Sequence, residues 1–415
     1  MARAMKDSGV AWIEKIPETW MIQRGKSILT LLERPVLQDD EVITCFRDGQ
    51  VTLRSNRREE GFTFSLQEVG YQGIEPGDLV VHGMDGFAGA IGISDSRGKG
   101  TPVLNVMDST QHKPFLVYYL RCAAYCGLFL SLATGIRVRS CDTNWNKIKN
   151  VLFLMPPLPE QSRIAAFLDR HCAEIDRVIA ATQRTIEEYK KLKQSIITEA
   201  VTHGVRGPRK MKDSGVEWIG DIPEEWSVVR HKYVMHKVKE ICEHYSGEDI
   251  ISLSMYGVRI RDLDAGGKMP TTFDGYQYVE PEDMLLCLFD IDVTPRCVGV
   301  VKNYGVTSPA YSRFVVHKGY LNRYYDYLLR FIDDEKIFVH LAKNLRSSLT
   351  ETDFGVIKTI APALDEQIEI ADYLDGRCAE IERLIEAKQR LLTELEAYKK
   401  SVIYEYVTGK KEAPQ

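Results

Sequence analysis

The chain has 415 residues, more than one hydrophobic core usually holds, so we expect at least two domains. Its 44% apolar and 27% charged residues exclude a disordered chain, a collagen and a disulfide-stapled miniprotein. The net charge of −5 neither indicates nor excludes nucleic-acid binding, which depends on a local basic patch. No apolar run reaches the roughly 18 residues of a membrane span, no apolar leader is present, and the nine cysteines form no C-x-x-C pair. These features predict a cytoplasmic protein with reduced thiols and no membrane contact.

An internal duplication organises the chain. Residues 5–20 recur as residues 211–226 with 12 of 16 positions identical, at an offset of 206 residues. Residues 164–202 align without gaps on residues 370–408 at the same offset, and 20 of 39 positions match. The regions between them resemble each other only faintly. Drift after duplication is one explanation, but two copies of one scaffold carrying two different recognition surfaces explain better why similarity is kept at the ends.

The divergent middle of each half predicts a mixed α/β domain of about 150 residues with its own core. Short β-type runs alternate there with turns rich in glycine and aspartate. We expect strands at residues 42–46, 78–81, 90–94 and 151–155 of the first half, and at 250–253, 284–288 and 356–360 of the second. One helix per domain is expected, near residues 115–132 and 322–341.

Each half ends in a segment that predicts a long helix, because apolar residues recur at alternating three- and four-residue steps. Prolines precede each helix, and Gly204 and Gly409 lie where the helices should end. About 40 residues of helix would make a rod of roughly 60 Å. The proposed pairing seam comprises Leu168, Ile175, Ile179, Ile186, Ile196, Leu374, Ile381, Ile385, Leu392 and Leu395, and the same stripe includes Leu192 and Tyr398.

These elements predict consecutive segments. They are a first domain at residues 1–155, a long helix at 156–205, a second domain at 206–361, a second long helix at 362–410 and a tail at 411–415.

Motifs for catalysis are weak or absent in the sequence. Gly25, Lys26 and Ser27 look like the end of a phosphate-binding loop, but Trp20 occupies the position of the required upstream glycine. No H-E-x-x-H, G-x-S-x-G or Asn-Pro-Pro-Tyr motif occurs, and the histidines do not cluster at metal-ligand spacing. The sequence therefore predicts no catalytic residue, no metal site and no cofactor bound by this chain.

Basic residues in the two middle regions are the candidates for nucleic-acid contacts, because arginine and amide side chains read base edges while lysine and arginine bind phosphates. Charge alone favours a solvated surface for any single cluster. The candidates in the first half are Arg47, Arg54, Asn56, Arg57, Arg58, Arg97, Lys99, Arg137 and Arg139. Those in the second half are Lys237, Lys239, Arg259, Arg261, Arg296, Lys302 and Arg346.

This combination resembles the DNA-specificity (S) subunit of type I restriction-modification systems, and the resemblance covers essentially the whole chain. Three duplicated motifs carry it: Ile-Pro-Glu-x-Trp, the Pro-x-Leu-x-Glu-Gln helix openings and Ala-Glu-Ile-(Asp/Glu)-Arg. They lie at residues 16–20 and 222–226, 156–161 and 362–367, and 173–177 and 379–383. The Pro-Pro of the first opening is replaced by Pro362-Ala363 in the second, a change that leaves the helix start intact.

The resemblance implies an α+β fold in which two mixed α/β target-recognition domains are separated by two long antiparallel coiled-coil helices, with a pseudo-twofold internal repeat. Each domain would read one half of an interrupted, asymmetric site on double-stranded DNA. The implied partners are two methyltransferase (M) subunits, which bring S-adenosylmethionine, and restriction (R) subunits, with ATP and Mg on the partners. The chain itself would be a non-catalytic subunit that directs adenine methylation or restriction.

The sequence also permits a function of another class. A duplicated coiled-coil scaffold could bind other proteins and have no role at DNA. Binding to site-bearing and random duplexes separates these two hypotheses. A self-sufficient methyltransferase is disfavoured because the catalytic and cofactor loops are lacking.

Overall fold

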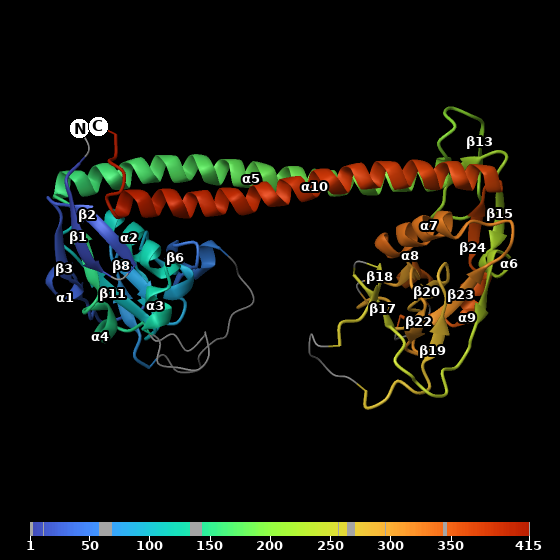
Figure 1. Ribbon diagram of the computed structural model, residues 1–415, viewed down its shortest axis with the longest axis horizontal. Coiled ribbons are helices and arrows are strands. Elements are labelled where there is room, and N and C mark those ends of the chain that lie inside the picture. The colour runs from blue at the N-terminus through green and yellow to red at the C-terminus, as the bar shows by residue number, and fades with distance from the viewer. Residues whose placement is uncertain are drawn as a thin grey trace. The chain divides into compact units, whose positions relative to one another are not determined.

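The computed structural model describes residues 3–10, 12–57, 69–132, 143–255, 257–263, 270–294, 296–342 and 347–414. The chain forms two compact units, of which the first contains Met1–Gln183 and Arg390–Gln415 and the second contains Arg184–Gln389. Each unit combines one α/β domain with parts of the two long helices, α5 (Leu158–His203) and α10 (Leu364–Val407) (Figure 1).

The two long helices pack against each other in an antiparallel direction within each unit. In the first unit the beginning of α5 lies beside the end of α10, where Lys399 Nζ and Asp176 Oδ1 are 2.6 Å apart. In the second unit the end of α5 lies beside the beginning of α10, and Lys193 forms an ion pair with Glu382. The two acidic residues, Asp176 and Glu382, lie 206 positions apart in the sequence, and so do the two lysines. The same contact is therefore made once in each unit. The predicted long helices and their pairing are confirmed.

The predicted seam is largely turned inward. Leu168, Ile175, Ile186, Leu374 and Ile381 are buried, whereas Ile179, Ile196, Ile385, Leu392 and Leu395 are half-buried. Leu192 and Tyr398, which belong to the same stripe, are 46% and 51% exposed, and Ile197 is more buried than Ile196. A straight α-helix has 3.6 residues per turn, so a stripe with a 3.5-residue period drifts around its surface over many turns.

The strands and short helices of the two domains correspond in chain order. In the first unit they are β1 (Met5–Val10), β2 (Ile13–Pro17), β3 (Met21–Arg24), α1 (Gly25–Ile28), β4 (Thr30–Leu31), β5 (Ile43–Cys45), β6 (Val51–Leu53), the 3-10 helix Arg54–Asn56, β7 (Gln72–Ile74), β8 (Leu79–His82), the 3-10 helix Gly86–Ala88, β9 (Ile91–Ile93), β10 (Gly98–Gly100), β11 (Leu104–Asp108), α2 (Lys113–Tyr125), α3 (Leu128–Ser131), α4 (Trp145–Ile148) and β12 (Leu152–Met155). In the second unit they are β13 (Met211–Asp213), β14 (Asp221–Pro223), β15 (Ser227–Arg230), α6 (His231–Val234), β16 (Met235–Val238), β17 (Ile250–Ser254), β18 (Gly257–Ile260), β19 (Gln277–Val279), β20 (Met284–Leu286), β21 (Val298–Val300), β22 (Gly305–Thr307), β23 (Ser312–Val316), α7 (Asn322–Asp334), α8 (Ile337–Leu341), α9 (Glu351–Val356) and β24 (Lys358–Ala361).

Each domain is built on a four-stranded antiparallel sheet that packs against a helix. The strand order is β4-β11-β8-β9 in the first domain and β16-β23-β20-β21 in the second. Helix α2 lies against β9, and α7 lies against β21. The mixed α/β character of both domains is therefore confirmed.

Three predicted elements differ from the structure. The expected helix at 115–132 is divided into α2 and α3 by Gly127, whose φ of +81° interrupts the helical backbone. The expected helix at 322–341 is divided into α7 and α8 at Lys336, which has φ +56°. The expected strand at 356–360 begins only at Lys358, because Val356 ends α9.

The duplicated motifs have structural roles at equivalent places. Gln161 Nε2 donates to the Pro156 carbonyl at 2.8 Å, and its Oε1 accepts from the His112 backbone N–H just before α2. Gln367 makes the same two contacts, with the Pro362 carbonyl and with the Leu321 N–H before α7. Each glutamine therefore ties the start of a long helix to the helix of its own domain, which explains why both copies keep it.

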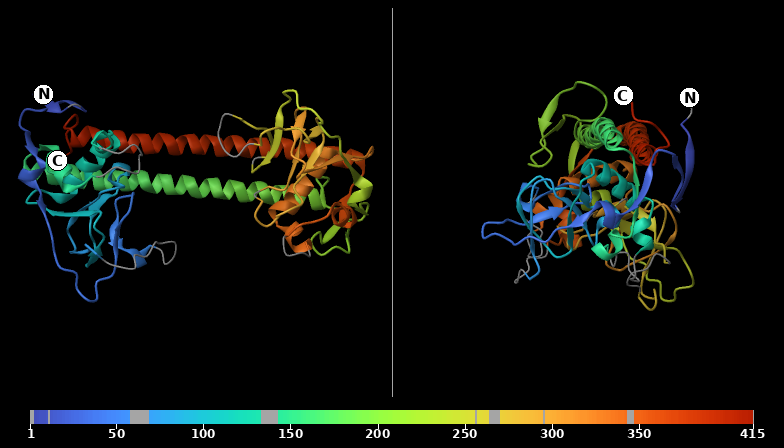
Figure 2. Two further views of the ribbon diagram at one scale, coloured as in Figure 1. Left: turned by 90° about the horizontal axis from the view of Figure 1, so that it is seen from below. Right: turned by 90° about the vertical axis from the view of Figure 1, so that its left-hand side faces the viewer.

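The N-terminal hairpin β1–β2 and its counterpart β13–β14 share one register, with Met5 opposite Pro17 and Met211 opposite Pro223. Each hairpin leads to a fully buried tryptophan, Trp20 or Trp226. In the first unit the end of α10 lies beside the first hairpin, which the end-on view of Figure 2 shows, and the Tyr404 hydroxyl donates to the Trp12 carbonyl at 3.3 Å. The two predicted stop glycines have left-handed backbones, with φ +78° at Gly204 and +71° at Gly409.

We expect Gly204→Ala to destabilise the second unit far more than Gly207→Ala does. Both glycines have a positive φ, which costs an alanine about 1–2 kcal/mol. A Cβ at Gly204 would also approach Glu366 Oε1 to 2.7 Å and the Trp226 ring to 3.1 Å, whereas one at Gly207 meets no atom within 4 Å. Overpacking adds about 1–3 kcal/mol, so urea unfolding should separate the two variants by that amount. Equal losses would contradict this packing of the helix end.

Acid should weaken the second unit through His231. This side chain is buried, its ring lies 4.5 Å from that of Phe354, and burial lowers its pKa to about 4 from 6.5. The unfolded chain therefore binds more protons between pH 6.5 and 4, so the free energy of unfolding should fall by up to about 3 kcal/mol as the pH drops through this window. Urea unfolding at several pH values should show this slope in the natural protein and a shallower one in His231→Phe. An identical slope in both would contradict it.

Candidate nucleic-acid interface

The hairpin β5–β6 presents the densest group of candidate residues in the first domain. Ile43 pairs with Leu53 and Cys45 with Val51, which leaves a tip at residues 46–50. The tip is closed by backbone hydrogen bonds from the Phe46 N–H to the Gln50 carbonyl and from the Gly49 N–H to the Phe46 carbonyl, each 2.9 Å. Arg47 therefore lies at the tip of the hairpin. The 3-10 helix that follows β6 brings the chain back toward this tip.

Arg47 and Arg57 lie at one open hollow of about 710 Å³. Arg47 Nη2 is 2.8 Å from Asp85 Oδ1, and Arg57 Nη1 is 2.7 Å from Asp48 Oδ2. The guanidinium carbon of Arg57 lies 4.1 Å from the centroid of the Phe46 ring. The full lining is Thr44, Cys45, Phe46, Arg47, Asp48, Arg57, His82 and Asp85.

The other described candidates of the first domain have contacts within it. Arg54 Nε donates to Thr44 Oγ1 at 3.3 Å, and Asn56 Nδ2 donates to Thr52 Oγ1 at 2.8 Å. Arg97 forms ion pairs with Asp40, at 3.0 Å, and with Glu75, and its hydrogen bonds lower the pKa of the Asp40 carboxyl. Lys99 is half-buried on β10. Arg58, Arg137 and Arg139 lie outside the described residues.

The candidates of the second domain are more dispersed. Lys237 on β16 pairs with Glu351, and Arg296 Nη1 lies 2.8 Å from Asp334 Oδ1. Arg259 on β18 is exposed and Arg261, just after that strand, is half-buried. Lys239 and Lys302 are exposed, whereas Arg346 lies outside the described residues. Arg259 thus lies on the hairpin β17–β18 and Arg261 just after it, and this hairpin corresponds in chain order to β5–β6.

Sequence reasoning missed the side chains that hold the arginines of the first domain in place. Phe46 and Asp48 are the sequence neighbours of Arg47. An aromatic residue within an arginine-rich segment is a signal that could have identified Phe46 as part of the site. His82 and Asp85 come from the end of β8 and the loop after it. Nothing in the sequence relates these two residues to an arginine almost 40 positions earlier.

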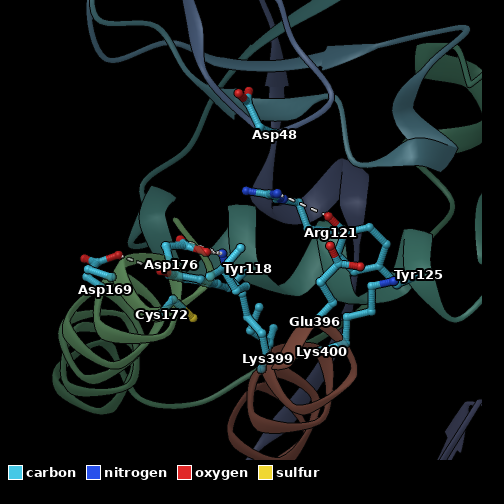
Figure 3. Close-up of a pocket in the computed structure, with 13 residues that line it drawn as sticks. Asp48, Tyr118, Arg121, Tyr125, Asp169, Cys172, Asp176, Glu396, Lys399 and Lys400 are labelled. Carbon is cyan, nitrogen blue, oxygen red and sulfur yellow. Dashed lines mark hydrogen bonds and ion pairs between the residues drawn. The ribbon is translucent and has the colours of Figure 1, made fainter. Parts of the chain in front are cut away.

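A second kind of cavity lies between each domain and the long helices. In the first unit it measures about 460 Å³, and the Tyr118 hydroxyl donates to Asp169 Oδ1 at 2.8 Å on its wall (Figure 3). In the second unit a cavity of about 580 Å³ has the Tyr327 hydroxyl 2.7 Å from Asp375 Oδ1. Burial and the neighbouring carboxylate raise the pKa of both tyrosines, so the hydroxyls remain donors. In each unit this hydrogen bond links a helix of the domain to a long helix, α2 to α5 in the first and α7 to α10 in the second.

The described residues hold no group of three or more His, Cys, Asp or Glu side chains arranged to bind a metal ion. Among the helices of the described chain, none is both long and apolar enough to cross a membrane.

Three curated proteins with similar sequences are named as type I restriction enzyme specificity subunits. No family model matches the sequence. A Methanocaldococcus jannaschii protein assigned as the MjaX type I restriction enzyme specificity subunit is 22% identical over 96% of this chain and 95% of its own length. The chain is similar to type I restriction specificity subunits. The MjaVIII specificity subunit of the same organism is 25% identical over 63% of this chain and 62% of its own length. The EcoKI specificity subunit of Escherichia coli is 25% identical over 45% and 43%.

Solved structures share the fold. A chain from a structure of a type I restriction-modification system superposes with a TM-score of 0.73 at 16% identity and covers 95% of this chain and 99% of that one. The HsdS subunit of Thermoanaerobacter tengcongensis gives a TM-score of 0.52 at 16% identity, with coverage of 95% and 98%. The predicted fold class, two α/β domains and two long helices, is confirmed.

Proposed function

We propose that this chain is the DNA-specificity subunit of a type I restriction-modification complex. It binds a bipartite, asymmetric site on double-stranded DNA and directs adenine methylation or restriction by partner subunits. The observation that carries the proposal is similarity to a specificity subunit along 96% of the chain. The alternative, a scaffold with no role at DNA, lacks such support because the similar proteins are restriction subunits.

In this proposal the two α/β domains, residues 1–155 and 206–361, are the target-recognition domains, and the candidate basic residues are their DNA contacts. The domains have diverged far more than the hairpins and helices that carry them, so each domain reads a different half-site. The helices at residues 156–205 and 362–410 act as spacers, and residues 411–415 are a tail. Antiparallel helices give the chain a pseudo-twofold axis, which matches the symmetry of duplex DNA.

The chemistry of the complex belongs to its partners in this proposal. Two methyltransferase subunits bring S-adenosylmethionine, and restriction subunits bring ATP hydrolysis with Mg²⁺. The chain itself contributes target binding and is not an enzyme. It acts in the cytoplasm, where its cysteines stay reduced.

The test is methylation by the assembled complex. The chain co-expressed with its methyltransferase subunits should mark adenines within one interrupted motif, as read by methylome sequencing. In gel shifts the complex should prefer a duplex with this motif over a random duplex of equal length. The purified chain alone should transfer no methyl group. Equal binding to both duplexes, with no methylated motif in the host, would refute the proposal and favour a scaffold.

A further inference from the structure

We propose that the hollow beside the β5–β6 hairpin reads a guanine in the half-site of the first domain, through Arg47 and Arg57. The inference rests on the proposed function, and it separates base-reading arginines from those that contact phosphate or only stabilise the domain.

The two arginines are held in place before DNA arrives. The guanidinium of Arg57 lies 4.1 Å from the Phe46 ring centroid and is anchored by Asp48 at 2.7 Å. Arg47 is anchored by Asp85 at 2.8 Å. Each anchor engages one terminal nitrogen, and within the described part of the chain this leaves further N–H groups of the guanidinium able to donate. A planar donor fork that is already ordered loses little entropy when it meets a base.

The charge of the hollow favours a base over a phosphate. Two arginines face two carboxylates there, and burial raises the pKa of the Cys45 thiol to about 12, so this group stays neutral. The described lining of the hollow therefore has balanced charge. Phosphate binding depends on net positive charge and counterion release, whereas base reading depends on directed hydrogen bonds.

His82 adds a neutral donor to the two guanidinium groups of the hollow. His82 Nδ1 accepts from the backbone N–H groups of Asp85, at 3.0 Å, and Met84, at 3.2 Å. Burial lowers the pKa of His82, so its ring is neutral and carries its proton on Nε2. Guanine presents two acceptors, N7 and O6, in the major groove, whereas adenine presents one acceptor and one donor. Donors on arginine forks therefore favour guanine.

The neighbouring arginines do not fit this role. Arg97 forms ion pairs with two carboxylates, Asp40 and Glu75, and its side chain is 30% exposed. Arg54 donates inward, to Thr44 on strand β5 of the same hairpin. Arg47 and Arg57 line the hollow, whereas these two do not.

A charge-balanced variant tests the proposal. Arg57→Ala combined with Asp48→Asn removes one positive and one negative charge, and the asparagine keeps an oxygen for the Gln50 N–H that Asp48 accepts at 3.1 Å. The control is Arg24→Ala, which removes an exposed arginine on β3 of the same unit. Arg47→Ala tests the second arginine. The methylation motif and the binding of the methyltransferase complex to duplexes with single-base changes are measured at several salt concentrations.

We expect the Arg57 and Arg47 variants to lose about 5- to 150-fold discrimination at a guanine position of one half-site. The other half-site should keep its sequence, the charge-balanced variant should keep the salt dependence of binding, and Arg24→Ala should change neither. An unchanged motif in both hollow variants, with the natural complex active, would overturn the inference but leave the proposed function intact. Uniformly weaker binding with a smaller salt slope would also overturn it, because it identifies phosphate contacts. A natural complex that methylates no motif would refute the proposed function itself.

Discussion

A chain cut after Gly204 should form a homodimer that directs methylation of a palindromic site. The fragment keeps the first domain and all of α5 but loses α10, which covers the seam of Leu168, Ile175 and Ile186. Each fully buried aliphatic side chain contributes roughly 1.5–3 kcal/mol, so the exposed seam strongly favours a new partner. In a second copy of α5, Lys193 takes the place of Lys399 opposite Asp176, because the two lysines are equivalent in the repeat.

The cut site also removes a residue that would oppose this dimer. Arg206 forms ion pairs with Asp365 and Glu369, whose equivalents in the first half are Pro159 and Arg163. Light scattering should give twice the mass of the fragment, and the methylome should contain two inverted copies of the first half-site.

A matched pair of variants makes the test specific. Ile175→Asp changes a residue that is 6% exposed and should prevent the dimer, whereas Val178→Asp changes one that is 48% exposed and should leave it intact. A folded, soluble monomer, or a methylated site that stays asymmetric, would contradict the functional role assigned to the duplication.

Lengthening both helices should change the gap between the half-sites and leave their sequences unchanged. Four inserted residues add about one helical turn, or roughly 6 Å, which is close to two base-pair steps. The insertion falls near Glu187 in α5. The facing position in α10 follows from the register, since Asp176 pairs with Lys399 and Lys193 with Glu382, which places Lys388 opposite Glu187.

Methylome sequencing of a host with the lengthened chain should show the same half-sites with a gap wider by about two base pairs. An insertion in α5 alone is the control, because it breaks the register and should lower activity. An active, doubly lengthened chain that keeps the original gap would show that helix length does not determine the spacing.

The periodic and duplicated parts of the chain could be predicted well because local rules determine them. The long helices follow from apolar spacing, and their ends follow from glycines that take a left-handed backbone. The helix breaks at Gly127 and Lys336 were missed because a single residue with a left-handed backbone does not change the spacing of the apolar residues around it. The first compact unit contains both ends of the chain, because antiparallel pairing brings distant segments together.

The candidate interface was predicted only by residue type. The sequence placed Arg57 and Arg97 in one class, yet Arg57 lies at an open hollow and Arg97 forms ion pairs with Asp40 and Glu75. The difference depends on carboxylates brought near by the sheet, which no local pattern encodes. The contribution of Asp85 and His82 to the hollow is of the same kind.

The composition of the first unit sets an order for folding during synthesis. Its core joins Ile13, Ile16 and Trp20 with Val402, Ile403 and Val407 of α10. The ribosome makes the second domain before these last residues, so the first unit waits with part of its apolar core uncovered until nearly the whole chain has emerged. The second unit, in contrast, is formed by the continuous segment Arg184–Gln389, which is synthesised before these residues. The domain that is translated first therefore completes its core last. Premature termination within the final turns of α10 should destabilise the first unit, which contains the N-terminal domain, more than the second unit.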